Sequence, residues 1–146
     1  MATKVKFRMK DEAHDLYPRK AHTDDAAYDL YSASDVTIAS GERTLIPTGL
    51  HIALPEGFEA QVRPRSGLAL KKGLTILNTP GTIDAGYRGE VGIIAYNSSE
   101  ESLTFNRGDR IAQMVIQKLP EIELVQADTL ETSVRGEGGF GSTGHN

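Results

Sequence analysis

The sequence contains no cysteine and only four histidines, which limits the chemistry open to it. Without cysteine it can form no disulfide, no thiolate nucleophile and no zinc site with sulfur ligands. The histidines show no spacing typical of metal ligands and stand at His14, His22, His51 and His145. We therefore expect no metal ion to be held by protein nitrogen or sulfur.

Long apolar runs are also missing. Residues 1–10 alternate charged with apolar side chains, whereas a secretory signal needs an unbroken apolar run of about 7–15 residues. No later segment approaches the roughly 20 apolar residues that a membrane-spanning helix requires. The sequence therefore predicts a soluble, cytoplasmic protein that has no membrane partner.

A positive net charge is absent as well. The chain has 16 Lys and Arg against 20 Asp and Glu, for a net charge of −4. General affinity for nucleic acid depends on neutralising many phosphates, so this balance predicts no nucleic-acid partner. Any anionic ligand must instead be bound by a local cluster of positive charge.

What the sequence does contain is a series of short runs in which apolar and polar residues alternate, separated by Gly, Pro and Asp. The runs occupy residues 36–38, 50–54, 58–62, 74–78, 90–97, 102–105 and 110–119. The last run also fits a helix, but Gly108 and Asp109 precede it and Pro120 ends it, so we interpret it as a strand. At 146 residues the chain fits one all-β domain, folded as a sandwich, barrel or jelly roll.

The stretch "RPRSGLA" (63–69) combines a predicted helix start with basic residues. We expect one short helix over residues 66–73, capped by Ser66 and followed by Gly73 in the left-handed conformation. Taken alone, this is a helix cap beside a surface arginine. A helix N-terminus also offers unpaired backbone N–H groups, however, so Arg65 and Ser66 form a candidate phosphate site.

The stretch "IDAGYRG" (83–89) is typical of a tight hairpin, in which Gly86 would supply a positive φ. Asp84 directly before the turn is a potential general base, and Asn78 and Tyr87 flank it. An amide and backbone groups can pair with the edge of a base. A tyrosine packed against a sugar leaves no room for an additional hydroxyl, so these residue types suit a nucleoside pocket.

The stretches "AYDL" (27–30) and "GDRIAQ" (108–113) each have an ordinary interpretation. Asp29 is typical of a strand end, and Gln113 of a solvent-facing position in a strand. Arg110 and Gln113 can also both reach an anionic ligand. The carboxylate of Asp29, if it lies near phosphates, would orient the waters of a magnesium ion.

The C-terminal residues lose the strand pattern. Residues 121–134 contain one predicted short strand and then resemble an arm that leaves the domain, and residues 135–146 hold five glycines. This composition fits a disordered terminus, but successive glycines also let backbone N–H groups converge on a phosphate. Ordering the segment costs about 1–2 kcal/mol per residue, so we expect it to be mobile until a charged ligand binds.

Together and in this order, five segments resemble the five motifs of the homotrimeric dUTPases (deoxyuridine triphosphate nucleotidohydrolases), and the resemblance covers nearly the whole chain. The segments are "DAAYDLYS" (25–32), "RPRSGLA" (63–69), "NTPGTIDAGYRGEVG" (78–92), "RGDRIAQMV" (107–115) and "RGEGGFGSTG" (135–144). The resemblance implies a distorted jelly roll of the β-clip type for residues 1–120, a C-terminal arm at 121–134 and a mobile glycine-rich lid at 135–146.

The resemblance also implies hydrolysis of dUTP to dUMP and pyrophosphate. Mg²⁺ would be bound mainly by the substrate triphosphate. The enzyme would be a homotrimer in which each active site is shared between subunits, with the lid and the catalytic hairpin supplied by different chains.

A role for each site residue follows from the same resemblance. Asp84 would activate the water that attacks the α-phosphorus, and Asp29 would act on the metal through water. Tyr87 would pack under the deoxyribose, and Phe140 would cover the uracil. The uracil edge would be bound by Asn78 and the backbone of Gly81, Thr82 and Ile83, and the phosphates by Arg65, Ser66, Gly67, Gln113, Arg135, Gly141, Ser142 and Thr143.

Two other functions stay open at this stage. The dCTP deaminases look similar in fold and hairpin, but deamination would need a glutamate beside the base, and Glu90 is the only other acid near Asp84. The second alternative is a nucleotide-responsive regulatory protein whose target is another protein. The glycine-rich C-terminus argues against the first, and the sequence offers no added domain for the second.

Overall fold

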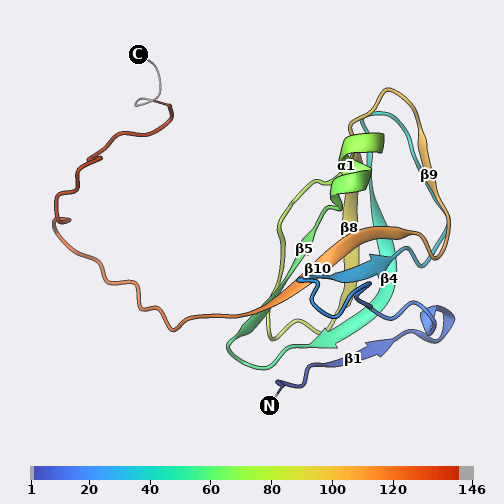
Figure 1. The fold of residues 1–146 in the computed structure, drawn as a ribbon, viewed down its shortest axis with the longest axis horizontal. Coiled ribbons are helices and arrows are strands. Elements are labelled where there is room, and N and C mark those ends of the chain that lie inside the picture. The colour runs from blue at the N-terminus through green and yellow to red at the C-terminus, as the bar shows by residue number, and fades with distance from the viewer. Residues whose placement is uncertain (1, 142–146) are drawn as a thin grey trace.

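The computed structural model describes residues 2–141 and is built mainly from β-strands (Figure 1). In chain order the elements of this described part are β1 (Lys6–Met9), the 3₁₀ turn η1 (Asp11–Ala13), β2 (Tyr28–Tyr31), β3 (Val36–Ile38), β4 (Arg43–Ala53), β5 (Phe58–Arg63), α1 (Ser66–Lys72), β6 (Leu74–Ile76), β7 (Gly81–Ile83), β8 (Glu90–Asn97), β9 (Leu103–Phe105) and β10 (Arg110–Lys118).

The strands form two four-stranded sheets and a small third one. One large sheet has the order β1-β4-β8-β6 and the other β2-β10-β5-β7, while β3 pairs with β9. Every pairing between these strands is antiparallel. The predicted all-β jelly roll with one short helix is therefore confirmed.

The core lies between the two large sheets because alternate residues of their strands point inward. Along β8, buried and half-buried residues alternate from Glu90 to Asn97, as the sequence pattern predicts. The core contains large buried side chains from both sheets, including Leu30, Ile46, Ile93, Ile111 and Met114. Within residues 2–141, no helix is long and apolar enough to cross a membrane.

Of the run 110–119, which fits a helix or a strand, residues 110–118 form the strand β10, which pairs with both β2 and β5. Helix α1 is also present, but its start differs from the prediction. Arg65 is the N-cap residue, Ser66 is the first helical residue, and no side chain caps this end. Gly73 does end the helix in the left-handed conformation, with φ of 70°, and donates its N–H to carbonyls of the last turn.

The predicted hairpin at residues 83–89 is wrong, because the two flanking strands belong to different sheets. Strand β7 pairs with β5, whereas β8 pairs with β4 and β6. The connection crosses from one sheet to the other, and its turn is closed by a 3.1 Å hydrogen bond from the Tyr87 N–H to the Asp84 carbonyl. Gly86 is not among the residues with positive φ, since this turn does not need one.

Beyond β10 the chain leaves the body, and Figure 1 shows it extending away in one direction. Residues 121–134 contain no helix or strand, so the short strand predicted there is absent from the single chain. Every residue from 121 to 137 is exposed. We refer to residues 121–134 as the arm and to 135–146 as the tail, of which the structure describes 135–141.

Candidate active site

Six predicted site residues line one cavity of about 210 Å³ at the connection between β7 and β8, which we call the turn cavity. They are Asn78, Gly81, Thr82, Ile83, Asp84 and Tyr87. The Asp84 side chain is exposed, and no described residue forms a hydrogen bond or ion pair with its carboxylate. The cavity therefore combines an unpaired carboxylate, an amide, strand backbone and an aromatic ring.

The ring of Tyr87 is held at its far end. Its hydroxyl donates a 2.7 Å hydrogen bond to the Glu90 carbonyl, at the first residue of β8. The Arg88 guanidinium donates to the carbonyls of Ala85 and Tyr87, at 2.6 and 3.1 Å. The turn that presents Asp84 and Tyr87 is thus fixed by its own polar groups, although the tyrosine side chain stays 46% exposed.

Glu90 ties this turn to the rest of the body. Its carboxylate accepts a hydrogen bond of 2.9 Å from the Gly49 N–H and forms a 2.6 Å ion pair with Lys10. Burial alone would raise the pKa of the Glu90 carboxyl, but the bonds from Lys10 and Gly49 oppose it, and the net pKa is lowered. The same bond to Glu90 raises the pKa of Lys10. The carbonyl that holds Tyr87 therefore belongs to an anchored residue.

Five more predicted residues line a second cavity, of about 400 Å³, which we call the arginine cavity. They are Asp29, Arg65, Ser66, Gly67 and Gln113. The Gln113 amide donates to the Pro64 carbonyl at 3.0 Å, and an Arg65 nitrogen donates to the Arg110 carbonyl at 3.2 Å. These contacts hold the start of α1 against β10, where the segments "RPRSG" and "GDRIAQ" meet.

The arginine cavity also contains residues that sequence reasoning did not select. Arg63 and Asp25 line it, as does Arg110, which the sequence already indicated as able to reach an anionic ligand, so three guanidinium groups face it together with two carboxylates. Arg63 could have been found, because it lies two residues before Arg65 in extended backbone and such residues share a face. It also pairs in register with Gln113.

Carboxylates in this cavity bear on magnesium binding. The Asp29 carboxylate lies 3.7 Å from an Arg110 nitrogen, and Asp25 accepts a 2.9 Å hydrogen bond from the His22 N–H. Among residues 2–141, no group of three His, Cys, Asp or Glu side chains could hold a metal ion. Carboxylate oxygens are hard ligands that suit Mg²⁺ through water, so the donor set fits an ion held mostly by a ligand.

The tail residues lie apart from both cavities in the single chain. The described tail (residues 135–141), which holds Arg135, Phe140 and Gly141, continues from the extended arm (Figure 1), and the Arg135 side chain donates to the Gly138 carbonyl. Phe140 is fully exposed and has φ of 53°. Ser142 and Thr143 lie outside the described residues. The turn cavity and the arginine cavity share no lining residue, so one chain presents its predicted site residues in three separate groups.

Comparison with known proteins identifies relatives of this chain. The family model described as dUTPase matches residues 13–144. A deoxyuridine 5'-triphosphate nucleotidohydrolase from Clostridium tetani is 52% identical over 141 residues, which are 97% of this chain and 95% of the relative.

Solved structures are similar as well. The dUTPase of Staphylococcus bacteriophage 80alpha, solved with dUPNHPP, superposes with a TM-score of 0.88 at 31% identity, covering 99% of this chain and all of that one. A mutant dUTPase from phage phi11 of S. aureus has a TM-score of 0.79 at 29% identity and covers 89% of this chain and all of that one. The latter structure concerns the coordination of a structural Mg(II) ion.

Proposed function

Since this chain belongs to the dUTPase family and is a dUTP diphosphatase, which converts dUTP to dUMP and pyrophosphate, we propose that Asp84 is the general base of the reaction. One observation carries the proposal: Asp84 shares a cavity with Asn78, Tyr87 and the backbone of β7. Its carboxylate has no partner among residues 2–141, so it is available to orient a water and accept its proton.

Uracil selection is assigned to the same cavity. Asn78 and the backbone of β7 offer donors and acceptors to the uracil edge, and cytosine presents the reverse pattern at the same positions. A site built to hydrogen-bond one base rejects another by about 10⁴–10⁵ when buried polar groups are left unpaired. The ring of Tyr87 packs against the deoxyribose and leaves no space for a 2'-hydroxyl.

The triphosphate is assigned to the arginine cavity, where Arg65, Ser66, Gly67 and Gln113 bind it. Its three guanidinium groups supply the positive charge that a chain of net charge −4 must concentrate locally. Phosphoryl transfer depends mainly on positioning and charge neutralisation. Mg²⁺, bound by the triphosphate and contacted by Asp29 through water, would neutralise further charge on the phosphate oxygens.

A homotrimer with shared sites accounts for the separation of these groups. In one chain the base-binding turn, the arginine cavity and the tail are apart, although one dUTP must touch all three. Three subunits that each contribute one group would complete a site. The arm then carries the tail of one subunit to the site of another, where Arg135 and Phe140, with Ser142 and Thr143, close over the substrate.

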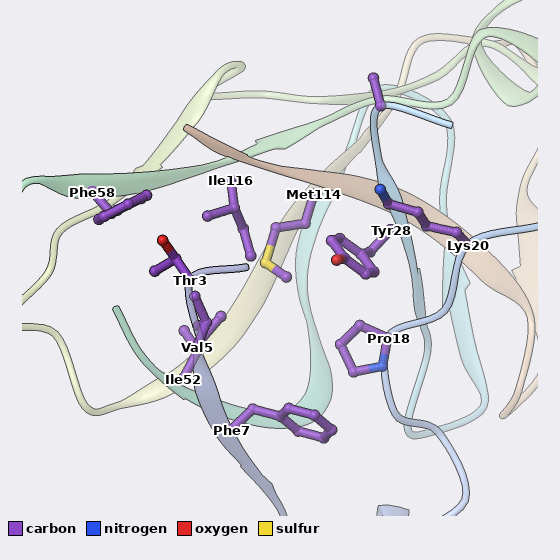
Figure 2. Close-up of a pocket in the computed structure, with 11 residues that line it drawn as sticks. Thr3, Val5, Phe7, Pro18, Lys20, Tyr28, Ile52, Phe58, Met114 and Ile116 are labelled. Carbon is purple, nitrogen blue, oxygen red and sulfur yellow. The ribbon is translucent and has the colours of Figure 1, made fainter. Parts of the chain in front are cut away.

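An open groove at the edge of the body supports such an assembly. Its volume is about 450 Å³, and residues of both edge strands, β1 and β2, line it. Figure 2 shows side chains from both sheets around it, with Met114 and Ile116 of β10 near Val5 and Tyr28. We call it the edge groove and assign it to the arm of a second copy.

The arm has the pattern that the edge groove needs. In residues 4–8, Lys4, Lys6 and Arg8 alternate with Val5 and Phe7, which line the groove. In the arm, acidic side chains alternate with apolar ones at Glu121, Ile122, Glu123 and Leu124. An arm added as a strand beside β1 would set carboxylates near ammonium groups and apolar side chains over the groove.

A substrate panel tests the proposed chemistry. Pyrophosphate release should be fast with dUTP and slower by orders of magnitude with dTTP, dCTP and UTP. The dCTP reaction is also assayed for ammonia, because deamination would identify the dCTP deaminase alternative. Comparable turnover of dUTP and dCTP would overturn the assignment of the turn cavity to uracil.

A further inference from the structure

Gly89 lies under the ring of Tyr87. A Cβ atom placed on Gly89 would stand 2.5 Å from the tyrosine hydroxyl oxygen, 2.6 Å from Cζ and 2.8 Å from Cε1. Real Cβ atoms essentially never come within 3.0 Å of another heavy atom in this way. The observed position of the ring therefore requires a residue without a side chain at position 89.

Backbone conformation does not explain the glycine. Gly89 is not among the glycines with positive φ, so its backbone lies where other residues are also allowed. Gly49, by contrast, has φ of 73° and a neighbour in Ala13 that would clash with any side chain. Gly89 is needed because it has no side chain, and the Tyr87 ring occupies the position that a side chain would fill.

We propose that Gly89 is a positioning residue that sets the preference for deoxyribose over ribose by seating Tyr87. The inference rests on the role assigned to Tyr87 above. Two groups hold the ring in position: the Gly89 backbone beneath it, and the Glu90 carbonyl, which accepts a 2.7 Å hydrogen bond from the tyrosine hydroxyl. Because Lys10 and Gly49 hold the Glu90 side chain, the carbonyl is a fixed point.

Replacing Gly89 by alanine should move the ring without unfolding the protein. The tyrosine side chain is 46% exposed, so it can swing toward solvent and lose little packing. The displaced ring would no longer bound the sugar, and a 2'-hydroxyl would find room. The expected change is therefore one of substrate preference, whereas a purely structural glycine would affect dUTP and UTP equally.

The experiment compares kcat/KM for dUTP and for UTP in four variants, with thermal unfolding of each. Gly89→Ala should lower the dUTP-to-UTP ratio by about tenfold or more, largely through a higher kcat/KM for UTP, whose 2'-hydroxyl then has room. Gly86→Ala is the matched control, because it lies in the same connection and a Cβ there meets nothing within 4 Å. Its ratio should equal that of the wild type.

Two further variants separate this inference from the proposed role of Tyr87. Tyr87→Ala should lower the ratio at least as much as Gly89→Ala, and an unchanged ratio would refute the role of Tyr87 itself. In the Tyr87→Ala background, Gly89→Ala should change nothing more, since no ring is left to displace. If Tyr87→Ala lowers the ratio but Gly89→Ala does not, or if the two effects add, Gly89 does not act through the ring.

Discussion

The connection between β7 and β8 and the C-terminal arm carry predicted site residues in opposite ways. The connection is fixed at both ends by strands of different sheets and by hydrogen bonds of Tyr87, Arg88 and Glu90. The arm forms no helix or strand, and all of its residues are exposed. The body therefore presents Asp84 in place before substrate binds, whereas the arm and the described part of the tail have no comparable contacts with the body.

This difference separates preorganisation from closure. A fixed carboxylate lowers the barrier because its position does not have to be organised during the reaction. A tail that orders only when substrate binds, as the proposed closure requires, would lose conformational entropy at each turnover but would allow substrate entry and product release. Changes in the connection should hence affect chemistry or selectivity, and changes in the arm and tail should affect closure or assembly.

The largest effect is expected at Asp84. In Asp84→Asn the side chain keeps its shape but cannot accept a proton from water, so kcat should fall by about 10³–10⁴-fold. Pyrophosphate release measures the rate, and calorimetry with a non-hydrolysable analogue measures binding, which should remain close to that of the wild type. Near-normal turnover would exclude Asp84 as the base.

Deleting residues 135–146 should give the next largest effect. Loss of Arg135 and the donors that follow it should slow dUTP hydrolysis by about 10²-fold or more, because each missing donor to a developing charge has a cost of this order. The unfolding midpoint should not change, because the described tail residues do not pack against the body. An unchanged rate would show that the tail takes no part in closure.

A single arm residue tests the assembly. Leu124 is 95% exposed in the single chain, and if it is buried in the edge groove of a second copy, Leu124→Asp removes about 1.5–3 kcal/mol of stabilisation per arm. Because each proposed trimer would lose three such contacts, it should dissociate at a protein concentration more than about tenfold higher than the wild type in sedimentation experiments.

Leu70 provides the matched control for that variant, since it is 87% exposed on α1 and lines none of the cavities described above. Leu70→Asp should leave the sedimentation of the protein unchanged. Equal behaviour of the two aspartate variants, or a wild type that sediments as a monomer, would contradict the docking of the arm.

Alternation of apolar residues reports which face of a strand is buried, so the sequence predicted β8 over its full length and β10 to within one residue of its end at Lys118. It did not predict β1, β2 or β7, and it predicted only the last part of β4 (Arg43–Ala53). Alternation does not reveal which strands pair, so the connection at 84–89 was mistaken for a hairpin. The strand predicted in the arm is absent because a strand forms only beside a partner edge, which one chain does not supply.

The site was predicted only in part, because a sequence shows which residue types stand together in one segment but not which segments meet in the fold. Short segments such as "RPRSG" contain the chemistry of a phosphate site, and the arginine cavity brings Arg65 and Gln113 together as expected. Arg63 and Gly89 were missed because their importance depends on contacts across the fold. Gly89 in particular is an ordinary turn glycine until the position of the Tyr87 ring is known.

The smallest predicted effect concerns the pair of Lys10 and Glu90, which anchors the carbonyl beneath Tyr87. The pKa of Glu90 is lowered from its ordinary value of 4.5, so the pair stabilises the fold above that pH, and the stabilisation is lost as the pH falls through the lower folded value. The pKa of Lys10 is raised from 10.5, so its contribution is complete below that pH and is lost as the pH rises through the higher folded value.

The unfolding midpoint of the wild type minus that of Glu90→Gln should therefore be constant between these limits and shrink toward both extremes of pH. The side chains of Lys10 and Glu90 are 41% and 23% exposed, so the difference in unfolding midpoint should be small and should decrease at high salt. Glu56→Gln in an exposed loop is the control and should show no such profile. If the difference in midpoint between the wild type and Glu90→Gln does not depend on pH, the carboxylate does not anchor the turn through its charge. The hydrogen bond from the Gly49 N–H must then hold β8 in place by itself, because a glutamine amide can also accept it.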